Sequence, residues 1–328
     1  MADTIALVGG EALLGRELRE VIGETDLAAN LRLVASADEE SGTLTDVGGS
    51  AAFLARLDPD DLEDASVLLL AGSPESSKRA LEGHPKGLVI DLTYTAEDDP
   101  DARIRAPQIE PAGFRSDNTG PQIVAHPAAT AIAMVLGRLN VTFPIARAVV
   151  HIFEPASEYG TPGIEELQQQ TVSLLNLQPL PKQVFDTQLA YAMLPQLGSE
   201  AAAPLADVED RIERHLATLL ERMEGCPMPS LRLIQAPVFH GFSFSFWIEF
   251  EDAPDASEIE DVMSQDNFDV RGGDLEAPNN VGVAGQSGIA IGAISADRNS
   301  GNAFWIWAAV DNLRLAAESA AMIAREAL

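Results

Sequence analysis

The chain has 328 residues, 46% of them hydrophobic, and its 51 acidic and 21 basic side chains give a net charge of −30. Such a negative field repels phosphate backbones and anionic lipids, so nucleic acid and acidic membrane surfaces are not expected partners. No apolar run approaches the roughly 18 residues of a membrane span, the first residues are acidic, and a lone cysteine fits a reducing compartment, so we expect a cytoplasmic protein.

The first third of the chain alternates short apolar runs with helical segments. A glycine-containing turn at 9–15 and a helix at 14–22 follow the first run, and Ser73-Pro74-Glu75 begins another helix. Strands are predicted at 4–8, 31–36, 66–71, 87–92 and 122–125. This alternation predicts an α/β fold with a doubly wound parallel sheet.

The pattern changes at Pro127, which suits the first turn of a helix. Alternating residues indicate long strands, above all at 231–250, and together with amphipathic helices they predict an antiparallel α+β domain. The other expected strands lie at 146–153, 289–294 and 304–309, and the helices at 163–176, 208–223 and 257–264. We expect residues 127–310 to form this domain, and residues 1–126 to form the other together with a final helix at 311–328.

Eight short motifs in matching order resemble the aspartate-semialdehyde dehydrogenase family. They are the Gly9–Gly15 turn, Ala35-Ser36, Leu70-Ala71-Gly72, Val89-Ile90-Asp91, the Pro127 helix, Gly163-Ile164-Glu165-Glu166-Leu167, Pro237-Val238-Phe239 and Asp311-Asn312-Leu313-Arg314. The resemblance implies a Rossmann-like dinucleotide-binding domain, a dimerising catalytic-type domain and therefore a homodimer.

The same resemblance implies that the catalytic positions have been replaced. His126-Pro127-Ala128-Ala129-Thr130 resembles the family's Asn-Pro-x-Cys-Ser/Thr-Thr, which places Ala129 at the attacking cysteine. Gly241-Phe242-Ser243 resembles Gly-His-Ser, which places Phe242 at the base, and period-two alternation would put His240 on the same strand face, about 6–7 Å away. Gln235 falls at the substrate-binding arginine and Glu154 at the carbonyl-orienting glutamine. A carboxylate at 154 would repel an anionic substrate.

Two further arginine sites of the family are also lost. Its phosphate-binding arginine falls at Glu97, and a pair of arginines on a later strand falls at Ala293 and Ser295. Arg103 and Arg105 lie near Glu97 in the sequence, where we expect an exposed loop.

The cofactor-binding segment is altered in the same way. The family's Gly-Ala-Thr-Gly-Ala-Val-Gly becomes a turn that keeps Gly9, Gly10 and Gly15 but has Glu11 and Ala12 within it. The middle glycine lets the backbone approach a pyrophosphate, so the Ala12 methyl group obstructs that approach. The acidic run Ala37-Asp38-Glu39-Glu40 should reject the 2′-phosphate of NADP, whereas Asp38 could bind a ribose hydroxyl of NAD. We expect that no cofactor is required, with weak NAD binding as the alternative.

These replacements predict a non-catalytic member of the family, similar to its Usg-type homologues, that acts as a dimeric interaction or regulatory protein. An active paralogue or another enzyme of amino-acid biosynthesis is a candidate partner. The alternatives are a ligand sensor for NAD or an acyl metabolite, and an enzyme with rebuilt chemistry. The latter would use Thr130 as nucleophile with His126, His151 or Glu154 as base.

Two remaining features point to structure rather than chemistry. Cys226 lies in the turn Gly225-Cys226-Pro227 and is expected to be a structural or exposed thiol. No pair among the five histidines has the helical or turn spacing of a metal site, so we expect no metal.

Overall fold

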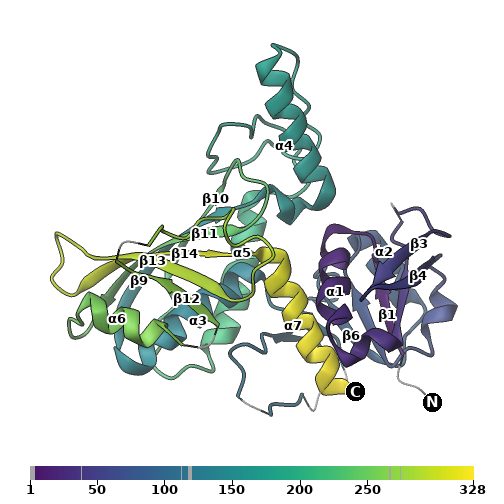
Figure 1. The fold of residues 1–328 in the computed structure, drawn as a ribbon, viewed down its shortest axis with the longest axis horizontal. Coiled ribbons are helices and arrows are strands. Elements are labelled where there is room, and N and C mark those ends of the chain that lie inside the picture. Colours follow the sequence, from purple (N-terminus) through teal and green to yellow (C-terminus); the bar gives the residue numbers. More distant parts are fainter. Residues whose placement is uncertain (1–3, 38, 112, 117–119, 266, 274) are drawn as a thin grey trace. The chain divides into compact units, whose positions relative to one another are not determined.

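The computed structural model describes residues 4–37, 39–111, 113–116, 120–265, 267–273 and 275–328 (Figure 1). The chain divides into two compact units, one of residues 1–125 with 316–328 and one of residues 126–315. Among the described residues, no helix is long and apolar enough to cross a membrane.

The first unit is built on an eight-stranded sheet with the order β3-β4-β2-β1-β5-β6-β8-β7. All of its strand pairs are parallel except the β3–β4 hairpin. The strands are β1 (Ile5–Val8), β2 (Leu31–Val34), β3 (Leu44–Val47), β4 (Ser50–Ala55), β5 (Val67–Leu70), β6 (Leu88–Asp91), β7 (Arg103–Arg105) and β8 (Gln122–Val124). The α-helices of this unit's chain segments are α1 (Leu13–Gly23), α2 (Pro74–Glu82) and all but the first turn of α7 (Asn312–Ala327), and the 3₁₀ turns are Asp26–Asn30 and Pro59–Leu62.

The central strands are buried on both faces, which explains their continuous apolar sequence. Ile5 and Leu7 pack toward α1 and the alanine-rich face of α7, whereas Ala6 and Val8 pack toward α2 and the second 3₁₀ turn. Helical cover on both faces is the doubly wound arrangement, so the predicted fold class is confirmed for this unit.

The second unit is built on a six-stranded sheet with the order β10-β9-β11-β14-β13-β12. The strands are β9 (Ile145–Glu154), β10 (Ser230–Gln235), β11 (Phe242–Phe250), β12 (Phe268–Arg271), β13 (Ile289–Ala296) and β14 (Ala303–Val310). Its helices are α3 (Pro127–Thr142), α4 (Gly160–Leu175), α5 (Leu205–Leu220) and α6 (Ala256–Met263), and a 3₁₀ turn, η3 (Ala156–Tyr159), links β9 to α4.

The structure corrects the sequence expectations for this second sheet. It is mixed rather than antiparallel, because β10 pairs with β9, and β12 with β13, in the parallel sense. The long strand expected at 231–250 is two strands, since the chain leaves the sheet after Gln235 and returns at Phe242. Pro237 lacks the N–H that a ladder requires, and Gly241 adopts φ +80° at the return.

Candidate functional site

The first part of the candidate site is the junction between β8 and α3. His126 caps α3, because its ring Nδ1 accepts the Ala128 N–H at 3.2 Å. The backbone N–H of His126 donates to Nδ1 of His215 at 2.9 Å. Ala129 and Thr130 lie in the first turn of α3 and are buried. The Thr130 hydroxyl has no hydrogen-bond partner. It therefore does not make the bond to the helix terminus that a threonine at such a position usually makes.

The second part lies where β9 and β10 end side by side. Glu154 and Gln235 are partners in the parallel ladder, and both side chains are fully buried. The Gln235 amide N–H donates to the backbone oxygen of Glu154 at 2.9 Å. Neither carboxylate oxygen of Glu154 has a hydrogen-bond partner, and neither does the amide oxygen of Gln235. Burying acceptors without donors costs free energy. A group that brings hydrogen-bond donors or positive charge would therefore stabilise the free oxygens of Glu154 and Gln235.

The third part is η3, which brings Glu158 and Tyr159 beside Glu154. The Asn312 amide holds η3, donating from Nδ2 to a Glu158 oxygen at 2.6 Å and to the Ser157 hydroxyl at 3.0 Å. Its oxygen accepts the Gly241 N–H at 3.1 Å. Nε2 of His126 lies 3.4 Å from the other Glu158 oxygen. One side-chain ligand atom from each of His126, Glu154 and Glu158 lies within 4.8 Å of the others. We call these three residues the His-Glu-Glu cluster.

Burial and mutual repulsion hold protons on the acidic groups of this site. Burial raises the pKa of Glu154 well above its usual value, and the charge of Glu158 raises it further. Burial raises the pKa of Glu158 to about 7, with an added contribution from Asp311, although the Asn312 hydrogen bond opposes the rise. The Tyr159 hydroxyl has no partner, and burial and both carboxylates raise its pKa. Burial therefore favours the protonated form of each of these groups relative to the same group in water.

Phe242 begins β11 and closes one side of the site. Its ring is fully buried and lies 5.9 Å from the His126 ring, centroid to centroid. His240 does not share its strand as expected, because it lies in the turn before β11, and its backbone oxygen accepts a bond from Asn280. The prediction that His240 and Phe242 lie on the same face of one strand is therefore wrong.

The remaining candidates lie outside the cluster. Arg105 is buried in β7 rather than exposed, with two hydrogen bonds from Nε and one from Nη2 to Glu110 and a 2.7 Å ion pair to Glu326. Arg103 is exposed in the same strand, and Glu97 lies in the loop after β6. The other positions considered from sequence lie on strands of the second sheet: His151 on β9, and Ala293 and Ser295 on β13.

Cys226 has the properties of an inert thiol. It is half-buried, and burial raises its pKa to about 11. Because the thiolate is the reactive form, this cysteine is a poor nucleophile near neutral pH.

The glycine turn of the first unit is shaped by close backbone packing. A Cβ on Gly15 would lie 1.8 Å from the Gly9 oxygen, and one on Gly9 would lie 2.3 Å from Gly72. A Cβ on Gly10 would meet side chains of the core instead. Ala12 precedes α1 with φ −58°, a value open to any residue. The Glu11 carboxylate is turned toward basic partners, Arg16 at 3.1 Å and Arg19 at 2.6 Å.

An acidic side chain from the end of β2 reaches this glycine turn. Glu39 accepts the Glu11 N–H at 3.2 Å through one oxygen and the Ser36 N–H at 3.0 Å through the other. Asp38, which the sequence suggested for this role, lies outside the described residues.

The sequence analysis assigned no functional role to Glu158 or Tyr159. The cluster forms only when the start of α3, the end of β9 and η3 meet, and Glu154 and Glu158, although four residues apart, do not lie on one helix. The spacing of Glu154 and Glu158 just after a predicted strand was the one available signal.

Comparison with known proteins gives one consistent result. The family model described as semialdehyde dehydrogenase, dimerisation domain, matches residues 136–315. Aspartate-semialdehyde dehydrogenase of Rickettsia bellii is 26% identical over 98% of this chain and 96% of its own length. The USG-1 protein homolog of Pseudomonas aeruginosa is 28% identical over 99% and 97%. The solved structure of a probable aspartate-semialdehyde dehydrogenase from Pseudomonas aeruginosa has a TM-score of 0.85 at 24% identity, covering 99% of this chain and 98% of that one.

The raised pKa of Glu158 predicts how stability changes with pH. The folded protein keeps this proton to about pH 7 while the unfolded chain releases it near 4.5, so the group lowers stability as pH rises through that window. The substitution Glu158→Gln removes this pH-dependent loss of stability. The variant should match the wild type near pH 4.5 and exceed it at pH 8 by up to about 3 kcal/mol in free energy of unfolding.

Urea unfolding at pH 4.5, 6 and 8 in the presence of a chelator measures this difference. Glu213→Gln, at an exposed position of α5, is the matched control and should show no pH-dependent gain. A Glu158→Gln advantage that is constant across pH would refute a raised pKa.

Proposed function

Because the chain belongs to the semialdehyde dehydrogenase family, we propose that it keeps the family fold without the dehydrogenase chemistry and acts as a dimeric interaction or regulatory protein. The observation that carries the proposal is the side chain at 129. It is a methyl group, fully buried in the first turn of α3, where the resemblance places a cysteine. Loss of a covalent nucleophile alone can cost on the order of 10⁶ in turnover.

Neighbouring residues do not replace this nucleophile. The Thr130 hydroxyl makes no hydrogen bond to a base, whereas an activated hydroxyl needs one. The Nδ1 lone pair of His126 is engaged by the Ala128 N–H, and its Nε2 faces Glu158. Phe242 can neither accept nor donate a proton at the position proposed for the base.

The substrate-binding side of the site has changed its charge. Gln235 lacks the guanidinium that pairs with a carboxylate, and the neighbouring Glu154 and Glu158 are acidic. An anionic substrate placed here would meet carboxyl groups in place of an arginine. This argues against restored activity even if a nucleophile were supplied.

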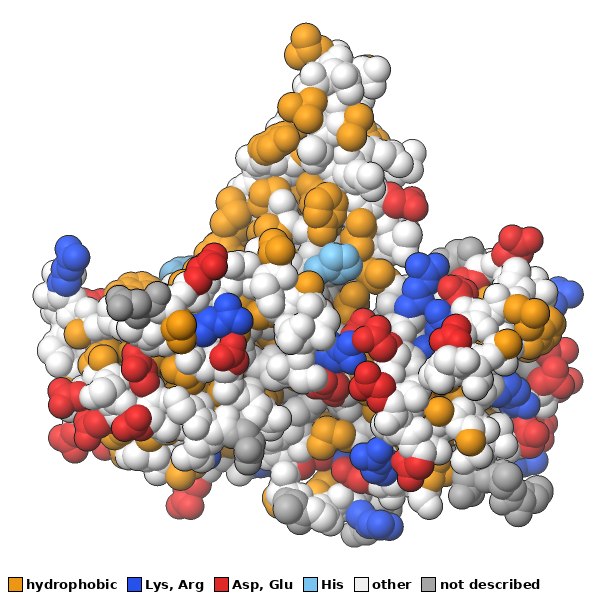
Figure 2. All heavy atoms as spheres, in the orientation of Figure 1, with side chains coloured by type: hydrophobic (Ala, Val, Ile, Leu, Met, Phe, Trp, Pro, Cys, Tyr) orange, Lys and Arg blue, Asp and Glu red, His pale blue; other side chains and the backbone are white. Residues whose placement is uncertain are grey.

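The dimer is proposed from the matched dimerisation domain and from an apolar surface in the same unit. Large hydrophobic side chains are exposed on α4 and the segment that follows it. Figure 2 shows hydrophobic side chains gathered on the part of the second unit that α4 forms in Figure 1. They are Val172, Leu175, Leu177, Tyr191 and Met193. Exposed apolar area of this kind marks a protein contact surface.

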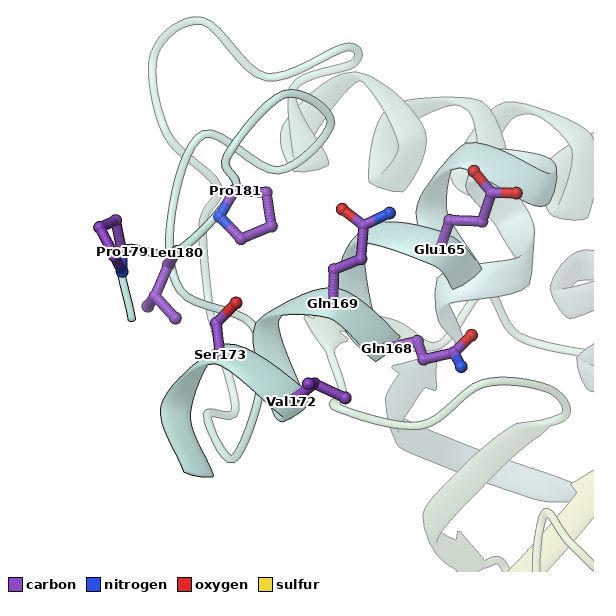
Figure 3. A pocket seen from close by; sticks show the side chains of 8 residues that line it. All are labelled: Glu165, Gln168, Gln169, Val172, Ser173, Pro179, Leu180 and Pro181. Carbon is purple, nitrogen blue, oxygen red and sulfur yellow. The ribbon is translucent and has the colours of Figure 1, made fainter. Parts of the chain in front are cut away.

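The same part of the second unit carries a hollow that a partner could fill. Its volume is about 620 Å³, and it lies between α4 and the loop segment 179–181 (Figure 3). Its walls combine apolar Val172, Leu180 and two prolines with polar Gln168 and Gln169. We propose that this α4 surface is covered by the second copy of the chain.

A second candidate function, NAD binding without turnover, is favoured by Glu39. Dinucleotide-binding folds hold a ribose hydroxyl with an acidic residue that follows the second strand and lies near the glycine turn. Glu39 follows β2, and its carboxylate accepts the Glu11 N–H of that turn. The same carboxylate would repel the 2′-phosphate of NADP. In this alternative the chain is a sensor that binds NAD.

The double substitution Ala129→Cys with Phe242→His tests the loss of chemistry. It supplies a thiol and a base but leaves Gln235 and Glu154 unchanged, so we expect no reduction of NAD or NADP with aspartate semialdehyde. Reduced cofactor formed by this double variant would contradict the argument from Gln235 and Glu154. Activity in the unmodified protein would overturn the proposal.

Titration with NAD and, separately, NADP distinguishes the two candidate functions. The first predicts no binding of either dinucleotide at millimolar concentration. The second predicts NAD binding below about 100 μM, which is about 5.5 kcal/mol, no binding of NADP, and loss of NAD binding in Glu39→Gln.

The dimer is tested by placing charge on the α4 surface. Leu175→Glu with Tyr191→Glu should reduce the solution mass from twice the 34.9 kDa of one chain to a single chain. Leu44→Glu, an exposed leucine of β3, is the matched control and should leave the mass unchanged. Light scattering after size exclusion measures the mass, and a dimer that survives the double substitution would exclude this surface.

A further inference from the structure

The His-Glu-Glu cluster joins three ligand-type side chains that come from separate elements. His126 lies at the start of α3, Glu154 at the end of β9 and Glu158 in η3. Their potential ligand atoms lie within 4.8 Å of one another. Bonds of about 2.0–2.3 Å from each ligand to one ion would bring such atoms within about 4.6 Å, so the cluster is close to the size of a coordination shell.

Glu154 is an independent sign that a ligand belongs here. Its side chain is fully buried, it reaches into the cluster, and neither of its carboxylate oxygens has a hydrogen-bond partner. A buried carboxylate is retained in proteins when it is paired or when it coordinates a metal. The nearby amide oxygen of Gln235 is also without a partner.

The groups around the cluster hold its ligands in place. Asn312 donates to Glu158 at 2.6 Å and fixes the orientation of that carboxylate. In the ion-free protein the Ala128 N–H bonds to Nδ1 of His126, and this orients the ring so that Nε2 faces Glu158 before an ion binds. The side chain of Glu158 is 16% exposed and that of His126 only 2%, so Glu158 marks the side from which an ion would enter.

We propose that His126, Glu154 and Glu158 bind one divalent transition-metal ion of the Zn²⁺ or Mn²⁺ class. Two carboxylates and an imidazole are a ligand set for these ions, whereas Mg²⁺ and Ca²⁺ favour oxygen alone. The two positive charges of the ion balance the two carboxylates. Ligation through Nε2 moves the ring proton to Nδ1, so the weak bond from the Ala128 N–H is lost on binding.

The sequence did not suggest this site, because His126 is distant in the sequence from both glutamates, and Glu154 and Glu158 lie on a strand and a 3₁₀ turn rather than on one helix. The inference does not depend on the loss of dehydrogenase chemistry, since ion binding is measured without any substrate. Three protein ligands would leave a fourth position on the ion for water or a small ligand.

Calorimetric titration of chelator-treated full-length protein with ZnCl₂ and with MnCl₂ tests the proposal. Excess Mg²⁺ in the buffer occupies the many exposed carboxylates of this acidic chain. We expect one ion bound per chain with a dissociation constant of micromolar or below for at least one of the two ions. The thermal midpoint should rise on loading.

The variant Glu154→Gln should weaken this binding at least 100-fold and abolish the rise in thermal midpoint. Glu213→Gln, the exposed matched control on α5, should bind as the wild type does. If Glu154→Gln fails to unfold cooperatively, Glu158→Gln takes its place with the same expected loss. Absence of saturable binding at 100 μM, or equal binding by Glu154→Gln and Glu213→Gln, would overturn the proposal.

Discussion

The burial of an unpaired carboxyl group at the end of β9 is the constraint on which the rest of the site depends. Glu154 is fully buried beside Gln235, and neither side chain supplies the other with a donor to its free oxygens. Ionisation there costs free energy, so the group keeps its proton or takes a cation. This arrangement favours a positively charged ligand and disfavours an anionic one.

The framework around this carboxyl group is well ordered by hydrogen bonds. Asn312 ties η3 to the turn before β11, and Asp311 caps α7 through the N–H groups of Leu313 and Arg314. His215 supports the junction of β8 and α3 from α5. The family fold and its supporting contacts are therefore present around the side chains that the resemblance places at the catalytic positions. That contrast supports the proposed interaction or regulatory role.

The elements that sequence patterns predicted best are those whose burial is uniform. The strands β1 and β5 are buried on both faces, and their unbroken apolar runs indicated a parallel sheet. The β3–β4 hairpin was missed because its residues are mostly exposed and alternate weakly, and β7 because it has only three residues, two of them arginine. The break between β10 and β11 was missed because apolar alternation continues on both sides of Pro237 and Gly241.

For the site, sequence motifs gave single positions but not their neighbours. Ala129 and Phe242 were proposed because each lies within a short motif, and Gln235 because it lies seven residues before Phe242. The meeting of Glu158 with Glu154 and His126 depends on how η3 folds back against the segment after β10, where Ala156 and Ser157 donate to the backbone of Val238 and Phe239. Long-range contacts of that kind leave no periodic trace in one sequence.

A single-turnover trapping experiment tests the absence of covalent chemistry most directly. The unmodified protein, in excess over aspartate semialdehyde, is incubated with NAD or NADP in phosphate-free buffer and then analysed by intact-protein mass spectrometry and nicotinamide absorbance. The account predicts an unchanged chain mass and no reduced cofactor. An acyl adduct on the chain together with one equivalent of reduced cofactor would contradict it.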